Sequence, residues 1–203
     1  MARITKSVEE RRQEIIAAAR ELFVENGFDK TQMADISKKM HVAQGLVYHY
    51  FKSKTDILYA VIDIITEEQA AATRKMLAEM QTSTLDGLSF LFREPPHLHS
   101  YGKLIPSLLA DSAIIDYCAK KLTVAALPQV TALIERGNAD GSWNCENPEV
   151  TAAFILHGVS GVMGSSVPAC RDDGKQKAIA GVIFRVLGLS DENYLKWVAS
   201  LQT

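Results

Sequence analysis

The chain of 203 residues has little cysteine, glycine and proline and almost no net charge. Its three cysteines, Cys118, Cys145 and Cys170, are odd in number and form no Cys-x-x-Cys pair, which argues against a disulfide framework or a zinc finger. The 12 glycines and 6 prolines are too few for a collagen-like or low-complexity chain. A net charge of −2 excludes a generally basic nucleic-acid coat but leaves room for a local basic patch.

Long hydrophobic runs are also scarce. The exception is the stretch 151–170, which carries no Asp, Glu, Lys or Arg over 20 residues and is long enough to span a bilayer. It also holds three glycines, a histidine and a proline, so we interpret it as a helix buried in protein and expect no membrane association. The first residues lead into charged sequence without an apolar run, which, with the scattered cysteines, predicts a cytoplasmic protein.

Most of the remaining sequence follows the helical period of 3.6 residues, and no alternating strand pattern is found. Pro128 is expected to kink or divide the helix that contains it, and a turn is expected from Gly137 to Gly141. The fold class is therefore all-α, with about nine or ten helices. Their approximate bounds are 8–26, 31–40, 44–51, 53–80, 85–92, 98–110, 114–136, 148–166, 175–187 and 191–201.

Charge is divided unevenly along these helices. Residues 1–56 hold ten Lys or Arg and eight acidic residues, whereas residues 57–203 hold 12 and 16. The first part is small, helical and mildly basic, and the second is larger, acidic and apolar. This predicts an N-terminal three-helix module over 1–56, joined by a long helix to a larger helical domain over 57–203.

Two short predicted helices separated by a turn at 41–43 have the layout of a helix-turn-helix. The second helix would fit the major groove of DNA, with its first residues at the base edges. The Gln44 amide can read adenine, Gly45 permits close approach, and Lys54 suits a phosphate oxygen. The residues expected at DNA are Thr31, Gln32, Gln44, Gly45, Leu46, Tyr48, His49, Lys52 and Lys54. Ordinary packing in a helical bundle is the alternative, because any bundle contains such helix pairs.

The first quarter of the chain resembles the TetR family of bacterial transcriptional regulators. The resemblance is carried by the runs Ala34-Asp35-Ile36-Ser37, Val42-Ala43-Gln44-Gly45 and Leu46-Val47-Tyr48-His49-Tyr50-Phe51-Lys52-Ser53-Lys54, and by Asn26-Gly27-Phe28 after the first helix. The chain departs from the family at His41, where glycine is usual, and at Ala43, where Ser or Thr is common. Both departures concern the geometry of the turn and the cap of the recognition helix.

The resemblance implies that the larger domain binds a ligand and forms a dimer. The segment from 76 to 117 holds apolar and aromatic residues with a few polar tips, which suits a small, largely apolar organic effector. Ordinary core packing explains the same residues. The candidates are Met76, Phe90, Tyr101, Leu109 and Tyr117. His97 and His99 lack an evident third ligand, so no metal site and no cofactor are expected.

The dimer is expected to form through the last two long helices. Three glycines in the helix near 148–166 each cost it about 1 kcal/mol relative to alanine, and close approach of another helix would offset that cost. The resemblance implies a four-helix bundle across a two-fold axis. The expected interface residues are Phe154, Gly158, Gly161, Ile179, Ile183 and Val186. The alternative is that both helices pack only within their own subunit.

The resemblance thus implies a homodimeric transcriptional regulator that is not an enzyme. We expect a repressor that a small organic effector releases from a pseudo-palindromic operator. Two alternatives stay open. One is a ligand-independent, architectural DNA binder. The other is a helical enzyme, with a cleft formed by Asp111, His97, His99, Tyr117 and Cys118, although no nucleophile elbow or phosphate loop supports it.

Overall fold

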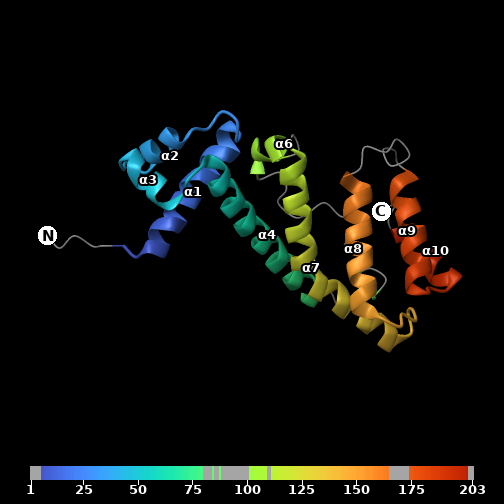
Figure 1. Cartoon of the computed structure of the whole chain (residues 1–203). Helices are drawn as coiled ribbons and strands as arrows, with labels where there is room; N and C mark the ends of the chain where they lie inside the picture. Colours follow the sequence, from blue (N-terminus) through green and yellow to red (C-terminus); the bar gives the residue numbers. More distant parts are fainter. Residues whose placement is uncertain are drawn as a thin grey trace. The chain divides into compact units, whose positions relative to one another are not determined.

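The computed structural model describes residues 6–79, 84, 87, 101–108, 111–164 and 174–200. Within these residues every regular element is a helix, which confirms the all-α prediction (Figure 1). The helices are α1 Val8–Asn26, α2 Met33–Lys39, α3 Gln44–Tyr50, α4 Lys54–Glu79, α6 Leu104–Leu108, α7 Ser112–Asp140, α8 Pro148–Gly164, α9 Gly174–Leu187 and α10 Asp191–Ser200. None of the described helices is long and apolar enough to cross a membrane.

The chain divides into two compact units. Unit 1 comprises Met1–Glu68 and Pro96–Cys118, and unit 2 comprises Gln69–Pro95 and Ala119–Thr203. Both α4 and α7 contain residues of each unit. The first boundary therefore lies inside α4, whereas the charge pattern changes at its beginning, so a domain boundary at residue 56 stays a prediction.

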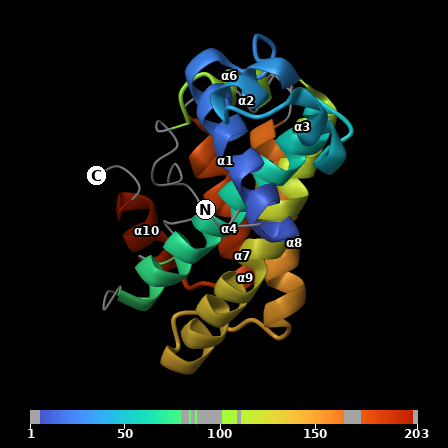
Figure 2. The same cartoon turned by 90° about the vertical axis from the view of Figure 1, so that its left-hand side faces the viewer.

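The core of unit 1 is built on the apolar stripe of α1. Ser7 begins α1 with a capping box: the Ser7 Oγ accepts from the Glu10 N–H at 3.1 Å, and the Ser7 N–H donates to the Glu10 carboxylate at 2.7 Å. Further along α1, Ile15 and Phe23 are fully buried. They pack in one cluster with residues of α2, α3 and α4, and α2 lies against both α1 and α3 (Figures 1 and 2). The three-helix module is thereby fixed by apolar burial.

The long helix α4 begins with a second capping box. The Ser53 N–H donates to the Asp56 carboxylate at 2.9 Å, and the Asp56 N–H donates to the Ser53 Oγ at 3.1 Å. The helix has 26 residues and a length of about 39 Å. Both its start and its length agree with the sequence prediction.

The segment before α6 departs from the predicted helix over 98–110. Gly102 has φ +46°, and a Cβ at this position would lie 2.7 Å from the Val24 carbonyl oxygen. The Lys103 N–H donates to the same oxygen at 3.0 Å. Because this backbone contact requires a left-handed glycine, the helix begins only at Leu104.

Of the two predicted outcomes at Pro128, a kink or a division of the helix, the division is wrong, because α7 continues through Pro128 over 29 residues. A proline removes one backbone hydrogen bond from a helix. The next turns carry Val130, Leu133 and Ile134, all of which are buried in the core of unit 2. Their burial offsets the lost hydrogen bond and keeps the segment helical.

The turn predicted from Gly137 onward begins later, because α7 ends at Asp140. The indole of Trp143 packs on Gly137, where a Cβ would lie only 1.9 Å from a ring atom. The indole N–H also donates to the Ile134 carbonyl at 2.8 Å. Gly137 is therefore needed for the space that the Trp143 ring fills and does not form a turn. Gly141, with φ +76°, is the left-handed residue that follows the helix.

The last three helices begin and end close to the predicted positions. Pro148 is the first residue of α8, and the Asn147 carbonyl accepts from the Thr151 N–H at 2.9 Å. Gly188, with φ +66°, follows α9, and the Ser190 hydroxyl accepts from the Asn193 N–H at 3.3 Å at the start of α10. Within unit 2, α9 contacts both α8 and α10.

Candidate nucleic-acid interface

The turn between α2 and α3 is compact and contains a left-handed residue. His41 has φ +54° and is the one non-glycine residue with positive φ in the described chain. Its N–H donates to the Lys38 carbonyl at 3.1 Å, and the Val42 N–H donates to the Ser37 carbonyl at 3.0 Å. Histidine thus occupies the conformation that glycine adopts most easily, at a cost in free energy. The Ala43 cap of α3 has no side-chain hydrogen bond, as the sequence predicts.

The short helix α3 has a buried side and an exposed side. Val47 is fully buried, and Phe51, which follows the helix, is 4% exposed. On the opposite side Gln44, Gly45, Tyr48 and His49 are exposed, and the apolar Leu46 is half-buried. Nothing lies within 4 Å of a Cβ built on Gly45. Packing within the chain therefore leaves a largely polar surface on α3. At Gly45 another molecule has room to approach the helix backbone closely.

The hydroxyl of Thr31 does not reach this surface. Thr31 is 1% exposed, and its hydroxyl donates to the Gly27 carbonyl at 2.9 Å. The cap of α2 is the exposed Gln32, whose backbone N–H donates to the Asp35 carboxylate at 2.8 Å. The Thr31 hydroxyl therefore closes the turn after α1, and the expected DNA contact of Thr31 stays a prediction.

The ammonium group of Lys54 is engaged with the protein. Its Nζ donates to the Phe28 carbonyl at 2.7 Å and lies 3.4 Å from the Asp29 carbonyl oxygen. It also lies 4.2 Å from the centroid of the Phe28 ring. The sequence predicts a phosphate contact here. The three contacts within the protein give Lys54 a structural role that the sequence does not predict.

Other cationic side chains near the helix-turn-helix differ in whether they contact an acidic or aromatic side chain of the same chain. Lys39 pairs with the Glu21 carboxylate at 2.7 Å, and this hydrogen bond raises the pKa of Lys39. Lys30, Lys38 and Lys52 are exposed and have no ion pair in the described part of the chain. The half-buried Arg12 lies over the Phe51 ring, 5.1 Å from its centroid. Neither Lys30 nor Arg12 is among the residues that the sequence predicts at DNA, because neither lies in the two helices of the motif.

Two of the predicted effector residues lie in unit 1, where both contact their own chain. Tyr101 is buried beneath the guanidinium of Arg20, which is 5.7 Å from its ring and pairs with Glu68 through two bonds of 2.7 Å. The Tyr117 hydroxyl donates to the Asp63 carboxylate at 2.8 Å, and its ring lies against that of Tyr59 at a tilt of 46°, with 4.6 Å between the ring centroids.

The other three predicted effector residues cannot be placed. Phe90, Leu109 and the side chain of Met76 lie outside the described residues. The effector site therefore stays a prediction.

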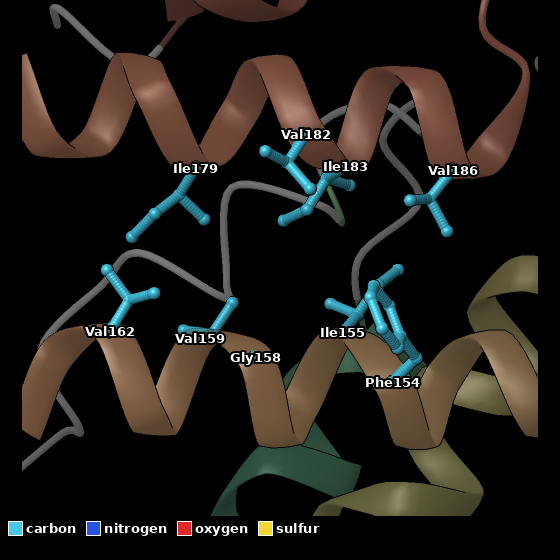
Figure 3. Close-up of a pocket in the computed structure, with 9 residues that line it drawn as sticks. All are labelled: Phe154, Ile155, Gly158, Val159, Val162, Ile179, Val182, Ile183 and Val186. Atoms are coloured by element: carbon cyan, nitrogen blue, oxygen red, sulfur yellow. The ribbon is translucent and has the colours of Figure 1, made fainter.

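An apolar groove of about 130 Å³ runs between α8 and α9 in unit 2. Figure 3 shows side chains of both helices pointing into it. Its lining residues are Phe154, Ile155, Gly158, Val159, Val162, Ile179, Val182, Ile183 and Val186. They include five of the six predicted interface residues, and Gly161 does not line the groove.

The groove is not covered by the described part of the chain. Phe154 is 61% exposed and Val182 is 55% exposed. A Cβ built on Gly158 or on Gly161 would meet nothing within 4 Å. Packing within the subunit therefore gives no reason for either glycine in α8.

The residues considered for a catalytic cleft have structural roles where they are described. The Asp111 carboxylate accepts from the Ala113 N–H at 2.8 Å at the start of α7. Burial raises the pKa of the Cys118 thiol, which disfavours the reactive thiolate. The described residues hold no group of His, Cys, Asp or Glu suited to a metal ion, and His97 and His99 lie outside them.

Residues 15–61 match the model of the family described as bacterial regulatory proteins, tetR family. Over 57 residues the chain is 46% identical to the HTH-type transcriptional regulator HbdR of Aromatoleum sp. (strain CIB), which covers 28% of this chain and 25% of HbdR. The first curated relatives are thus matched over about a quarter to a third of their length. The matching segment contains the whole helix-turn-helix.

Similarity in fold extends over nearly the whole chain. The structure of RolR in complex with resorcinol has a TM-score of 0.64 at 19% identity and covers 94% of both chains. The structure of FadR from Bacillus subtilis in complex with stearoyl-CoA has a TM-score of 0.54 at 18% identity and covers 86% of this chain and 97% of that chain. HbdR and the similar protein UidR of Escherichia coli (strain K12) are both named as HTH-type transcriptional regulators.

Proposed function

Because the chain belongs to the tetR family of bacterial regulatory proteins, we propose that it is a DNA-binding transcriptional regulator. It acts as a homodimer and responds to a small organic molecule. The observation that carries this proposal is the exposed polar side of α3, opposite the buried Val47 and Phe51. A helix anchored on one side and polar on the other suits insertion into the major groove.

On this surface Gln44 and Gly45 lie at the beginning of α3, where side chains of a recognition helix reach base edges. The Gln44 amide reads a base, and Gly45 lets the duplex approach the helix. Tyr48 and His49, one turn further on, are exposed and carry groups that can donate to phosphate oxygens. Gln32, Leu46 and Lys52 complete the proposed surface.

A second copy of the chain covers the groove between α8 and α9. Two such helix pairs related by a two-fold axis would bury Phe154 and Val182 against the partner. The open space at Gly158 supports this arrangement, because close approach of a helix would offset the cost of glycine. A dimer presents two recognition helices, which predicts a pseudo-palindromic operator.

A small organic effector changes the affinity of this dimer for DNA. Resorcinol and stearoyl-CoA in the structures of RolR and FadR support an organic ligand for a fold of this kind. The effector need only bind two conformations with different affinity, and such coupling is commonly about 1–3 kcal/mol. We propose that the free protein represses transcription and that the effector weakens operator binding.

The test is an electrophoretic mobility shift of the purified full chain on DNA from upstream of its own gene. We expect a shifted complex with two chains per duplex, lost in a Gln44→Ala, Tyr48→Ala double variant. The exposed Lys120, in the part of α7 that belongs to unit 2, provides a charge-changing control that should still shift the duplex. Equal binding by the wild type and the double variant would contradict the proposed surface.

An architectural DNA binder would also give this shift. A thermal-shift screen of small organic compounds distinguishes the two functions, because a bound effector raises the unfolding temperature. A compound that raises this temperature and also weakens the shift supports the regulator. Failure of all compounds in a broad screen would favour the architectural function.

A further inference from the structure

The turn between α1 and α2 and the turn between α3 and α4 meet at the ammonium group of Lys54. Lys54 follows the second turn, and its Nζ reaches the Phe28 carbonyl of the first turn, 26 residues earlier in the chain. The Asp29 carbonyl lies 3.4 Å away on the same side. This contact fixes one turn of the DNA-binding module against the other.

The same contacts reduce what Lys54 can offer to DNA. An ammonium group has three N–H donors, and two of them are directed at backbone carbonyls. Its remaining surface faces the Phe28 ring, 4.2 Å from the centroid, at a distance typical of a cation–π contact. A phosphate would have to compete with partners that are already held in place.

Lys30 and Lys52 belong to these two turns and have no such partners. Lys30 directly follows Asp29, and Lys52 precedes Lys54 by two positions. Both are exposed, and neither forms an ion pair in the described part of the chain. The carboxylate of Asp56, in the first turn of α4, accepts from the Ser53 N–H, and Asp29 is the acid of the turn between α1 and α2.

We propose that Lys54 is a positioning residue, and that Lys30 and Lys52 are the cations of these turns that contact the phosphate backbone. Lys54 holds the two turns together, and Lys30 and Lys52 are the exposed cations of these turns. This inference rests on the DNA binding proposed above. It assigns a DNA contact to Lys30, which lies outside both helices of the motif.

The test combines the salt dependence of DNA binding with the stability of the free protein. Affinity for a labelled duplex from upstream of its own gene is measured by fluorescence anisotropy at several salt concentrations. The proteins are the full-length wild type and the variants Lys30→Ala, Lys52→Ala, Lys54→Met and Lys120→Ala. Each phosphate contact contributes about 0.9 to the slope of log affinity against log salt, hence about 1.8 for a dimer.

Lys30→Ala and Lys52→Ala should each reduce the magnitude of the slope by about 1.8, which makes binding less sensitive to salt. Both variants should leave the unfolding temperature of the free protein unchanged. Lys54→Met should lower that temperature by about 3 °C or more and change the slope by less than half as much as the other two. Lys120→Ala should change neither quantity. If Lys54→Met fails to fold, the Lys30 and Lys52 variants alone decide which cations contact phosphate.

The opposite pattern would overturn the inference. A Lys54→Met variant of wild-type stability whose slope falls by about 1.8 would identify Lys54 as a phosphate contact. An unchanged slope in Lys30→Ala would remove Lys30 from the surface. Both outcomes differ from failure of the proposed function, in which the wild type itself shows no salt-dependent binding.

Discussion

The exposed side of α3 and the groove between α8 and α9 are both left uncovered by their own units, but they differ in composition. On α3 the uncovered residues are polar, with Gln44, Tyr48 and His49 around an open Gly45. In the groove they are apolar, with Phe154 and Val182 beside an open Gly158. A polar surface can remain in water until a polyanion binds, whereas an apolar groove gains free energy when it is covered. The difference supports the proposal that DNA binds the first surface and that a second copy of the chain covers the other.

The largest expected effect comes from placing a charge in the groove. Phe154→Asp would bury one unpaired carboxylate per subunit in the dimer, at a cost of several kcal/mol for each. We therefore expect association to weaken by at least about 100-fold, measured by sedimentation equilibrium. Affinity for the operator should fall as a consequence, because a monomer has one recognition helix.

The matched control for Phe154→Asp is Val124→Asp. Val124 is a 72% exposed residue of α7 that does not line the groove. The Val124→Asp substitution should leave the association of the two chains unchanged. Equal dimerisation of wild type and Phe154→Asp would remove the groove from the interface.

A smaller effect is expected when the polar surface loses its base contact. Gln44→Ala should cost about 1–3 kcal/mol on the preferred half-site and less on non-specific DNA. Competition anisotropy with both kinds of duplex measures the difference. Gln13, an exposed glutamine of α1, provides the control Gln13→Ala, which should bind as the wild type does. Unchanged base preference in Gln44→Ala would mean that the recognition side of α3 is misassigned.

The two open glycines allow a crossed test of the comparison. Gly45→Ala and Gly158→Ala should each stabilise the free chain, by up to about 1 kcal/mol, since alanine is the better helix former. Gly45→Ala should weaken DNA binding without changing the association of the two chains. Gly158→Ala should weaken this association, and DNA binding should fall only as a consequence. Chemical denaturation, sedimentation and anisotropy of both variants measure the three quantities. A Gly45→Ala variant with unaltered DNA affinity would show that close approach is not needed there.

The smallest effect concerns Lys39, which its pair with Glu21 withdraws from the polar surface. Because the hydrogen bond to Glu21 raises the pKa of Lys39 above its usual 10.5, the pair stabilises the folded state below that pH and loses its effect as pH rises further. Glu21→Gln should therefore lower the unfolding temperature slightly at pH 7 to 9, and the difference should shrink as pH rises above 10.5 and through the raised pKa of Lys39. A difference that grows with pH would contradict this account.

Local patterns in the sequence predicted most helices and one side of the site. Neighbours within one or two turns determine the approximate bounds of helices such as α1 and α4 and the exposure of Gln44, Tyr48 and His49 on α3. The same is true of Pro148 at the start of α8. Such features can be predicted because helical periodicity and capping act over a few residues.

The remaining features depend on residues far apart in the chain. Gly137 stays helical because of Trp143, and α6 begins late because Gly102 meets Val24. Thr31 is buried under the end of α1. Lys54 finds its acceptors 26 residues away, at a carbonyl whose position no local pattern indicates. Tertiary packing overrides local propensity at each of these positions, and only the folded structure shows it.

The most direct test of the account is selection of duplexes from a random DNA library by the purified full chain. The account predicts an enriched sequence with two-fold symmetry, whose half-sites are about one helical turn apart or a multiple of it. The same selection with the Phe154→Asp variant should lose this symmetry. Failure of the wild type to enrich any sequence, or enrichment of a single asymmetric site by a dimer, would contradict the claim that two copies joined through α8 and α9 read DNA with α3.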